Sequence, residues 1–218
     1  MSLTGGSLRG VASPSPQLWL LSLESSEPSR LSAQEEQWCA GLPARLQLRY
    51  RSSRSQLRAR VAQVLGCEPE AVALHSPPGQ PPRLAADQGY VSISHSAEAL
   101  LLAWSPAPIG IDLERWDRPL QAEPLARRFF PAQEVKDLLA LPPEQRSARF
   151  LESWVCKEAA IKWSASSIAA DLSHWLWNHD RKELWHLEQD WKPECAWHVR
   201  EGWCCAAVGD GVASAQWR

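Results

Sequence analysis

One predicted helix, residues 150–163 (FLESWVCKEAAIKW), constrains this chain more than any other stretch. Trp154, Glu158 and Lys162 follow one another at intervals of four residues, so a helix places them on one side. Lys157 comes three residues after Trp154 and is expected to border the same side. The segment therefore predicts a helix with one chemically reactive face, which needs a partner surface elsewhere in the chain.

The best partner for this helix is the segment IGIDLE, residues 109–114. Its apolar residues alternate with polar ones, so a strand would bury the first set and present Asp112 and Glu114 on its other face. Together with Glu158 they would supply three hard oxygen ligands, a set suited to Mg²⁺. Taken singly, the acids also fit solvated surface carboxylates, and Glu158 with Lys162 fits an ordinary helix ion pair.

The length and charge of the chain limit the classes of protein to which it can belong. The 218 residues can bury one good core or two small ones. A formal net charge of −2 provides no overall attraction to nucleic acid or to an anionic membrane. We find no apolar run of the roughly 20 residues that a membrane span needs, and no signal-peptide pattern. We expect a cytoplasmic protein that binds neither nucleic acid nor membrane, with residues 1–16 as a disordered lead-in.

The six cysteines do not predict a metal or disulfide framework. None forms a CxxC pair, and Cys204 and Cys205 are adjacent. In a reducing compartment such residues behave as small buried hydrophobic side chains. The histidines at positions 174, 179, 186 and 198 lack tight ligand spacing, and we interpret them as structural.

Periodicity and turn signals outline the remaining elements. The sequence predicts a strand at 17–24, a hairpin at 89–105, and a helix of about 32–41 that opens with a capping box of Ser32 and Glu35. A longer helix ends at Gly66, because glycine readily adopts the left-handed conformation that stops a helix. The tryptophan-rich segment after Asp171 predicts four short antiparallel strands, of which residues 213–217 (ASAQW) form the last.

Three arginines and one histidine are candidates for anion binding. Arg51, Arg54 and Arg58 lie at helical spacing beside an apolar stripe, which fits either a solvated basic face or a phosphate clamp. His95 ends a predicted strand among hydroxyl side chains, where it is equally compatible with a structural and a binding role. Acids for a metal with cations for phosphates suit a substrate that carries a pyrophosphate.

The order of these motifs resembles a known family. The pieces RSSRSQLRARVAQVLG, PGQPPRL, VSISHS, IGIDLE, ARRFF and FLESWVCKEAAIKW together resemble the 4'-phosphopantetheinyl transferase superfamily, in its long, monomeric, surfactin-synthetase-activating type. The resemblance runs from about residue 49 to residue 175. The pairing of IGIDLE with WVCKEAAIK at this separation is its most specific part.

The resemblance implies a reaction. The 4'-phosphopantetheine arm of coenzyme A would pass to a serine hydroxyl of an apo acyl or peptidyl carrier protein, and adenosine 3',5'-bisphosphate would leave. Mg²⁺, with Mn²⁺ as an alternative, would be held on the pyrophosphate by Asp112, Glu114 and Glu158. The resemblance also implies that Glu158 would take the serine proton, directly or through water. Lys162 would stabilise or protonate the leaving phosphate, with Lys157 near the same charge. The residues expected to bind coenzyme A are Arg49, Arg54, Ser94, His95, Lys157 and Lys162.

The resemblance also implies an α+β fold made of two similar halves, with the active site in the cleft between them. We expect residues 17–108 to form the half that binds the nucleotide of coenzyme A, and residues 109–218 the half that carries the acids. One departure concerns the loop that usually reads Gly-Lys-Pro in the family. Here it reads Gly79, Gln80, Pro81, which removes an expected cation near the coenzyme, unless Arg83 replaces it.

Two other functions use the same residues differently. A Mg²⁺-dependent nucleotide pyrophosphohydrolase would activate water instead of serine, but it would carry several clustered glutamates on one helix, whereas residues 150–163 contain Glu152 and Glu158 alone. A non-catalytic binding module would use the tryptophan-rich tail as a recognition surface, and would tolerate loss of the acids.

Overall fold

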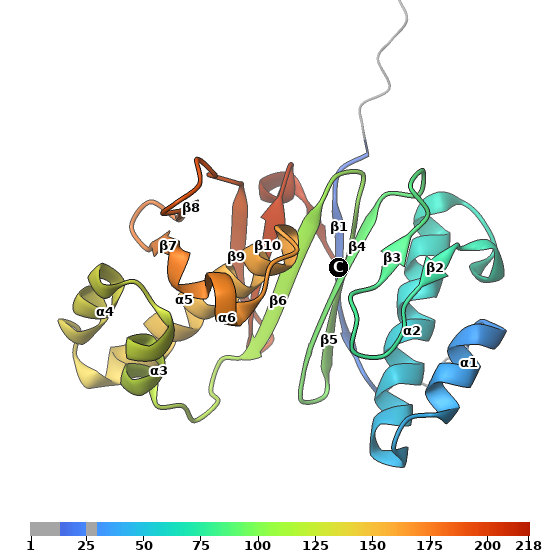
Figure 1. The fold of residues 1–218 in the computed structure, drawn as a ribbon, viewed down its shortest axis with the longest axis horizontal. Coiled ribbons are helices and arrows are strands. Elements are labelled where there is room, and N and C mark those ends of the chain that lie inside the picture. Colours follow the sequence, from blue (N-terminus) through green and yellow to red (C-terminus); the bar gives the residue numbers. More distant parts are fainter. Residues whose placement is uncertain (1–13, 25–29) are drawn as a thin grey trace, which may run out of the picture.

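Two β-sheets pack face to face between two long helices in this computed structural model, which describes residues 14–24 and 30–218 (Figure 1). The outer helices are α2 (Ala44–Leu65) and α5 (Pro143–Trp163), one against each sheet. The fold is therefore α+β, as the sequence predicts. The similarity of the two halves and their division at residue 108 stay predictions. Residues 1–13 of the predicted lead-in lie outside the described residues.

The first sheet has the strand order β11-β1-β5-β4. Its members are β1 (Gln17–Ser22), β4 (Tyr90–Ser96), β5 (Ala99–Ser105) and β11 (Gln216–Trp217). The strands β4 and β5 form the antiparallel hairpin that the sequence predicts at 89–105. The expectation for residues 213–217 is wrong in part: β11 pairs in parallel with β1 of the first sheet, so the end of the chain returns to its beginning.

The second sheet has the order β6-β10-β9, and two short ribbons complete the strands. The sheet consists of β6 (Ile109–Arg115), β9 (Cys195–Arg200) and β10 (Trp203–Gly209). The ribbons are β2 (Leu74–His75) with β3 (Arg83–Leu84), and β7 (Trp175–Asn178) with β8 (Glu183–His186). All pairs in the second sheet and the ribbons are antiparallel.

Alternation of side chains along the strands produces three stacked cores. In β6, Ile109, Ile111 and Leu113 face the cluster between the two sheets, which also holds Leu101 and Ala103 of β5. The intervening residues of β5 face α2, and those of β10 face α5; the clusters there contain Leu100, Leu102, Trp104, Cys204, Ala206 and Val208. Because Asp112 lies between Ile111 and Leu113, the strand must direct it away from the central core and toward α5.

The shorter helices cover the ends of this assembly. They are α1 (Ala33–Ala40), α3 (Ala122–Phe129), α4 (Ala132–Leu139) and α6 (Ile168–Asp171), with 3-10 turns at Pro69–Ala71, Leu172–His174 and Val212–Ser214. The capping box predicted for α1 is confirmed, with both the Ser32 and Glu35 side chains hydrogen-bonded to backbone amides. Gly66 ends α2 at φ 65°, also as predicted.

Gly110 allows β6 to touch α5 at backbone distance. A Cβ atom placed on it would lie 2.0 Å from the Ala159 carbonyl oxygen and 2.3 Å from the Trp163 backbone nitrogen. Neither of those atoms can rotate away, because both belong to the helix backbone. Glycine at this position therefore sets the separation of β6 from α5, and so the distance between the side chains that follow on each.

The cysteines and the helix lengths bear on two further predictions from the sequence. All six cysteines are free thiols; four are buried and two are half-buried, in agreement with their prediction as small hydrophobic side chains. Among the described residues, no helix combines the length and apolar character that a membrane span requires.

We predict that Gly110→Ala will destabilise the protein by about 3 kcal/mol, the upper part of the usual range for overpacking a core. The helix must move off the strand to admit the methyl group, which also separates Asp112 from α5. Chemical denaturation monitored by tryptophan fluorescence measures the change.

Gly41→Ala is the matched control. Gly41 has φ −77°, and its added Cβ would meet its nearest neighbour at 3.5 Å, an ordinary contact. This variant should unfold within about 0.5 kcal/mol of the unaltered chain. Equal stability of the two alanine variants would contradict the role assigned to Gly110.

Candidate active site

Polar side chains from β4, β6 and α5 converge where these three elements meet. Asp112 on β6 is the centre: its Oδ1 accepts hydrogen bonds from Ser94 Oγ on β4 at 2.8 Å and from Lys162 Nζ on α5 at 2.7 Å. Lys162 Nζ also lies 3.1 Å from Ser94 Oγ, which closes a triangle of hydrogen bonds. Three residues far apart in the sequence are thus joined around one carboxylate oxygen.

The second oxygen of Asp112 has no such partner. The residue is 3% exposed, and its Oδ2 is buried without a hydrogen bond from any described residue. A buried carboxylate oxygen normally has a donor or a cation beside it, because its desolvation is otherwise uncompensated. This atom therefore marks a position that a cation would satisfy.

Glu114 continues the acidic surface two residues along β6. Its Oε2 accepts a hydrogen bond from Ser96 Oγ at 3.0 Å, and its Oε1 forms an ion pair with Arg118 at 2.7 Å. Asp112 and Glu114 leave the same face of the strand, as the sequence predicts. Each is held by a serine of β4 and paired with one basic side chain.

Glu158 completes the acidic group from the helix. The pKa of Glu158 is raised from 4.5 to about 8, first by burial and then by the nearby charges of Asp112 and Glu114, while Lys162 and Arg118 oppose the shift. The three carboxylates are thus close enough to repel one another. A cation bound between them would relieve that repulsion and lower the pKa of Glu158.

These residues fit Mg²⁺ by their chemistry. The three acids offer hard oxygen atoms, and one of those atoms is a buried acceptor that lacks a donor. Asp112, Glu114 and Glu158 would hold the ion. The structure brings together the whole predicted ligand set, although metal binding itself stays a prediction.

A cationic group lies next to the acids, around His95 on β4. The pKa of His95 is lowered, first by desolvation and then by the positive charges of Arg49, Arg54 and Lys162, against its backbone hydrogen bond, which raises it. Arg54 is 7% exposed, and its Nε has no hydrogen-bond partner among the described residues. A buried guanidinium with a free donor beside other cations favours an anion, and phosphate matches its geometry.

The other two arginines of the predicted phosphate clamp have structural roles. Arg58 is buried and pairs with Glu35 of α1 at 2.7 Å, while its Nη1 donates to the backbone carbonyls of Pro69 and Val72. Arg51 forms an ion pair with Glu36. These contacts attach α1 to α2, so of the three arginines, Arg54 alone joins the cationic group around His95.

Lys157 does not lie where its helical spacing predicts. Its side chain is fully buried and forms an ion pair with Glu134 of α4, and its Nζ lies 3.7 Å from the centre of the Phe130 ring. It therefore points to α4 instead of bordering the face of Glu158. Successive residues of a helix are separated by about 100°, which is enough to turn Lys157 from the acids to the opposite helix.

A second polar cluster lies beyond the C-terminal end of α5, on α6, on the 3-10 turn after it and on β8. Asp171, His174 and His186 bring ligand atoms within 4.8 Å of one another, a proximity that their sequence spacing did not indicate. His186 Nδ1 accepts the backbone amides of Glu188 and Gln189, so its Nε2 carries the hydrogen and donates to Asp171 Oδ1 at 2.8 Å. This tautomer supports the structural interpretation of His186, because a protonated nitrogen cannot bind a metal.

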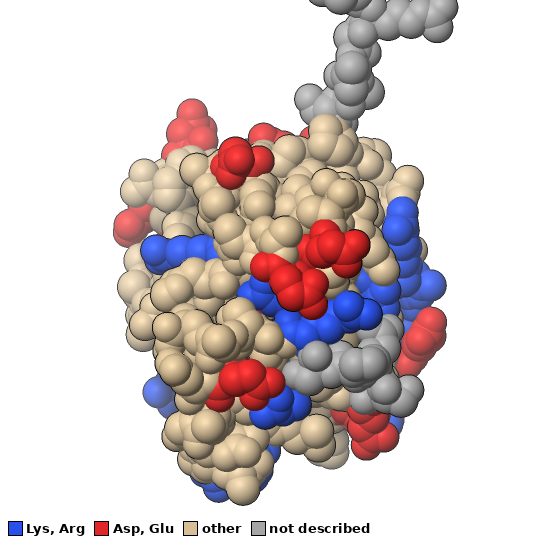
Figure 2. Space-filling view, turned by 90° about the vertical axis from the view of Figure 1, so that its right-hand side faces the viewer, with Lys and Arg blue, Asp and Glu red and all other residues tan. Residues whose placement is uncertain are grey.

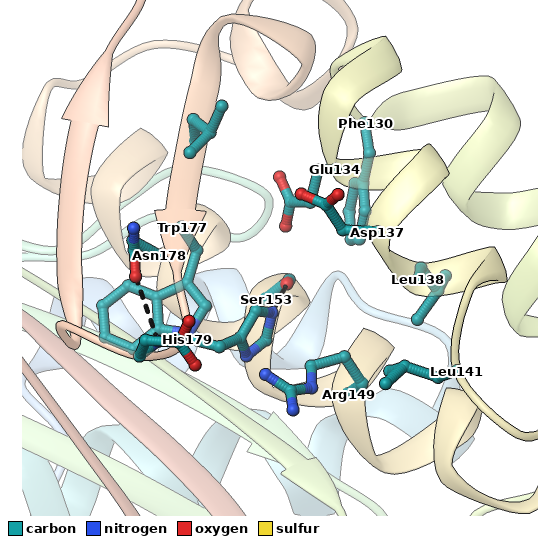
Figure 3. A pocket seen from close by; sticks show the side chains of 12 residues that line it. Phe130, Glu134, Asp137, Leu138, Leu141, Arg149, Ser153, Trp177, Asn178 and His179 are labelled. Atoms are coloured by element: carbon teal, nitrogen blue, oxygen red, sulfur yellow. Dashed lines mark hydrogen bonds between the residues drawn. The ribbon is translucent and has the colours of Figure 1, made fainter.

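A cavity of about 230 Å³ lies between α4, α5 and β7, and does not include the three acids (Figure 3). Phe130, Leu138 and Trp177 form part of its apolar lining. Ser153 and His179 point toward each other inside it, with Ser153 Oγ 2.9 Å from His179 Nε2. The buried Glu134 that pairs with Lys157 also lines it, so this cavity belongs to the contact of α4 with α5.

Charges of both signs are mixed on the outer surface over α2. Figure 2 shows Lys and Arg side chains gathered across the middle of this face, with Asp and Glu side chains beside them. No single sign covers it.

Comparison with known proteins confirms the resemblance inferred from the sequence. Residues 108–208 match the family model of the 4'-phosphopantetheinyl transferase superfamily. The matched range contains the three acids and Lys162. It does not contain Arg49, Arg54, Ser94 or His95.

Curated relatives carry the same name. The chain is 39% identical over 84 residues to 4'-phosphopantetheinyl transferase psf-1 of Bacillus pumilus, a match that covers 38% of this chain and 35% of the relative. It is 36% identical over 126 residues to HetI of Nostoc sp., with 56% and 53% covered, and 35% identical over 83 residues to Sfp of Bacillus subtilis, with 38% and 36% covered. The chain thus spans about a third to a half of the length of these relatives.

We predict that the metal-free protein loses stability as the pH rises through about 8, because of Glu158. Its pKa is higher in the folded chain than the ordinary value of 4.5, so the folded state retains the proton that the unfolded state releases. This contribution is complete below that ordinary value and is lost above about 8. Glu158→Gln should remove the dependence and stabilise the chelator-treated protein by about 1–3 kcal/mol at alkaline pH.

Denaturation curves across this pH range, with Glu70→Gln as a control at an exposed site, test the assignment. Identical pH profiles for Glu158→Gln and the unaltered chain would contradict it.

We predict that Lys157→Met will destabilise the protein by about 3–5 kcal/mol, since Glu134 would remain as a buried charge without its partner. The double variant Lys157→Met with Glu134→Leu should recover most of that loss, because it removes both charges. Thermal and chemical denaturation measure both. A single variant as stable as the unaltered chain would show that the pair is dispensable.

Proposed function

We propose that this chain transfers the 4'-phosphopantetheine group of coenzyme A to a serine hydroxyl of an apo acyl or peptidyl carrier protein, with Mg²⁺ and with release of adenosine 3',5'-bisphosphate. The observation that carries the proposal is the junction at Asp112. There an unpartnered buried carboxylate oxygen, two further acids and Lys162 meet, beside the cationic group around His95. A pyrophosphate needs both kinds of site, one for a metal and one for its anionic oxygens.

The name carried by the relatives supports the same reaction. The match to the family model includes the region of the acids and of α5. We infer the two substrates, a carrier protein and coenzyme A, from that resemblance. The monomeric state and the cytoplasmic location expected from the sequence belong to the same proposal.

Each proposed step has a residue suited to it. The cations on the β4 side of the junction would bind phosphate groups of coenzyme A. They are Arg49, Arg54 and His95. When bound, Mg²⁺ would neutralise charge on the pyrophosphate oxygens and polarise its phosphorus atoms. Glu158 would accept the proton of the incoming serine hydroxyl, for which a carboxylate in a partly buried site is well suited.

The bond changes then balance. The serine oxygen forms a bond to the phosphorus that carries the pantetheine, and the pyrophosphate bond to the adenosine phosphate breaks. The serine proton passes to Glu158. Lys162, which already lies against Asp112 and Ser94, would stabilise the charge on the departing phosphate. Lys157 has no part in these steps because it is buried against Glu134.

We predict that incubation of the chain with an apo acyl carrier protein, coenzyme A and Mg²⁺ will add the mass of one phosphopantetheine to the carrier. Intact-mass spectrometry measures the gain, and EDTA should abolish it. Consumption of coenzyme A without modification of any carrier would contradict the transfer and favour a pyrophosphohydrolase. The absence of both, across several unrelated carriers, would favour a binding module.

Two variants of α5 serve as the matched pair for this assay. Glu158→Gln should lower the rate by about 100-fold or more, the usual effect of losing a general base, while the protein stays folded. Glu144→Gln changes an exposed acid in the first turn of the same helix and should leave the rate unaltered. Undiminished transfer by Glu158→Gln would remove it from the mechanism.

A further inference from the structure

Three serines on β4 face β6 in register. Ser92, Ser94 and Ser96 alternate along β4, so their side chains share one face of the strand. Ser92 Oγ accepts the backbone amide of Ile111 at 3.2 Å, Ser94 Oγ donates to Asp112, and Ser96 Oγ donates to Glu114. The hydrogen-bond partners of successive serines thus follow one another along β6 in the same chain direction.

These hydroxyl groups connect two different sheets. Within the described residues, β6 pairs through its backbone with β10, and β4 pairs with β5. The serines supply hydrogen bonds from the first sheet to the second along the edge where β4 and β6 adjoin. Ser92 and Ser94 are buried and Ser96 is half-buried, so water competes little for the first two contacts.

Ser94 and Ser96 donate hydrogen bonds to the acids, whereas Ser92 contacts the backbone. A carboxylate on a strand can rotate about its side-chain torsions, and the rotation of Glu114 involves one torsion more than that of Asp112. A hydrogen bond to one carboxylate oxygen selects the rotamer and so fixes where the other oxygen points. At Asp112 the fixed oxygen is Oδ1, and the oxygen left for a cation is the unpartnered Oδ2.

We propose that Ser94 and Ser96 are positioning residues, which orient Asp112 and Glu114 for a divalent cation through hydrogen bonds from the neighbouring sheet. The proposal rests on the proposed function for the identity of the metal ligands. It changes the role expected for Ser94, which contacts the acid and Lys162 instead of standing free for a phosphate. It also assigns a role to Ser96, for which the sequence analysis gave none.

Ser96 provides the cleanest test, because its hydrogen bond is to Glu114, whereas Ser94 also contacts Lys162. We expect Ser96→Ala and Ser94→Ala to weaken Mn²⁺ binding by about 10–100-fold, the usual effect of removing an outer hydrogen bond to a metal ligand. Ser96→Thr keeps the hydroxyl group and should restore most of the affinity. Titration calorimetry and the electron paramagnetic resonance of Mn²⁺ measure binding on the full chain, with and without coenzyme A.

Ser92→Ala is the matched control on the same strand face. It removes a hydroxyl that contacts a backbone amide and no carboxylate, so it should leave Mn²⁺ affinity unchanged. Thermal denaturation of all variants separates a loss of folding from a loss of metal.

The outcomes distinguish this inference from the proposed function. Mn²⁺ affinity within twofold of the unaltered chain in both Ser94→Ala and Ser96→Ala would overturn the positioning role, while Asp112→Asn would still report on the metal site. Equal losses in Ser92→Ala and Ser96→Ala would also overturn it, because they would indicate a general weakening of the contact between the sheets. Failure of the unaltered chain to bind Mn²⁺, even with coenzyme A, would overturn both proposals.

Discussion

The close contact of β6 with α5 at Gly110 is the constraint on which the candidate site depends. The space for one methyl group is missing there, since a Cβ would approach the helix backbone to 2.0 Å. At that separation, Asp112, two residues further along the strand, reaches Lys162 of the helix at 2.7 Å. A bulkier residue would move the helix outward and open the junction of acids and cations. A position without a side chain thus determines the geometry of the charged side chains around it.

The charges of the junction balance one another only in part. Lys162 pairs with Asp112 and Arg118 pairs with Glu114, while burial, together with the remaining repulsion from those two acids, raises the pKa of Glu158 to about 8. The junction contains one acid more than the nearby cations can neutralise. Such an arrangement is stable only with a bound proton or a metal ion. The same excess that destabilises the metal-free protein at high pH would favour a divalent cation and its pyrophosphate ligand. Stability and the proposed function therefore draw on the same three carboxylates in opposite ways.

Local signals in the sequence predicted much of this structure. The capping box at Ser32, the left-handed stop at Gly66 and the alternation of β6 depend on near neighbours, and each is confirmed. The same signals predicted that the two acids of β6 share one face and that α5 packs against that face. Contacts between elements were beyond such signals. Lys157 has a partner on α4, 23 residues before it, that nothing in its helical spacing indicates.

The serine contacts of β4 and the return of β11 to β1 show the same limit. Ser96 contacts Glu114 because two strands from different sheets adjoin in a fixed register, which depends on the packing of the central core. A run of alternating serines and apolar residues predicts a strand, but not what the hydroxyl groups bind. The pairing of β11 with β1 likewise joins residues near opposite ends of the chain. Such contacts follow from the assembled tertiary structure and not from the spacing of motifs.

Anomalous diffraction from crystals of the full chain grown with Mn²⁺ and coenzyme A tests the proposed metal site most directly. We predict an anomalous peak within bonding distance of Asp112, Glu114 and Glu158, with the phosphate groups of the coenzyme extending toward His95 and Arg54. A peak at the cluster of Asp171, His174 and His186 instead, with none between the three acids, would contradict it.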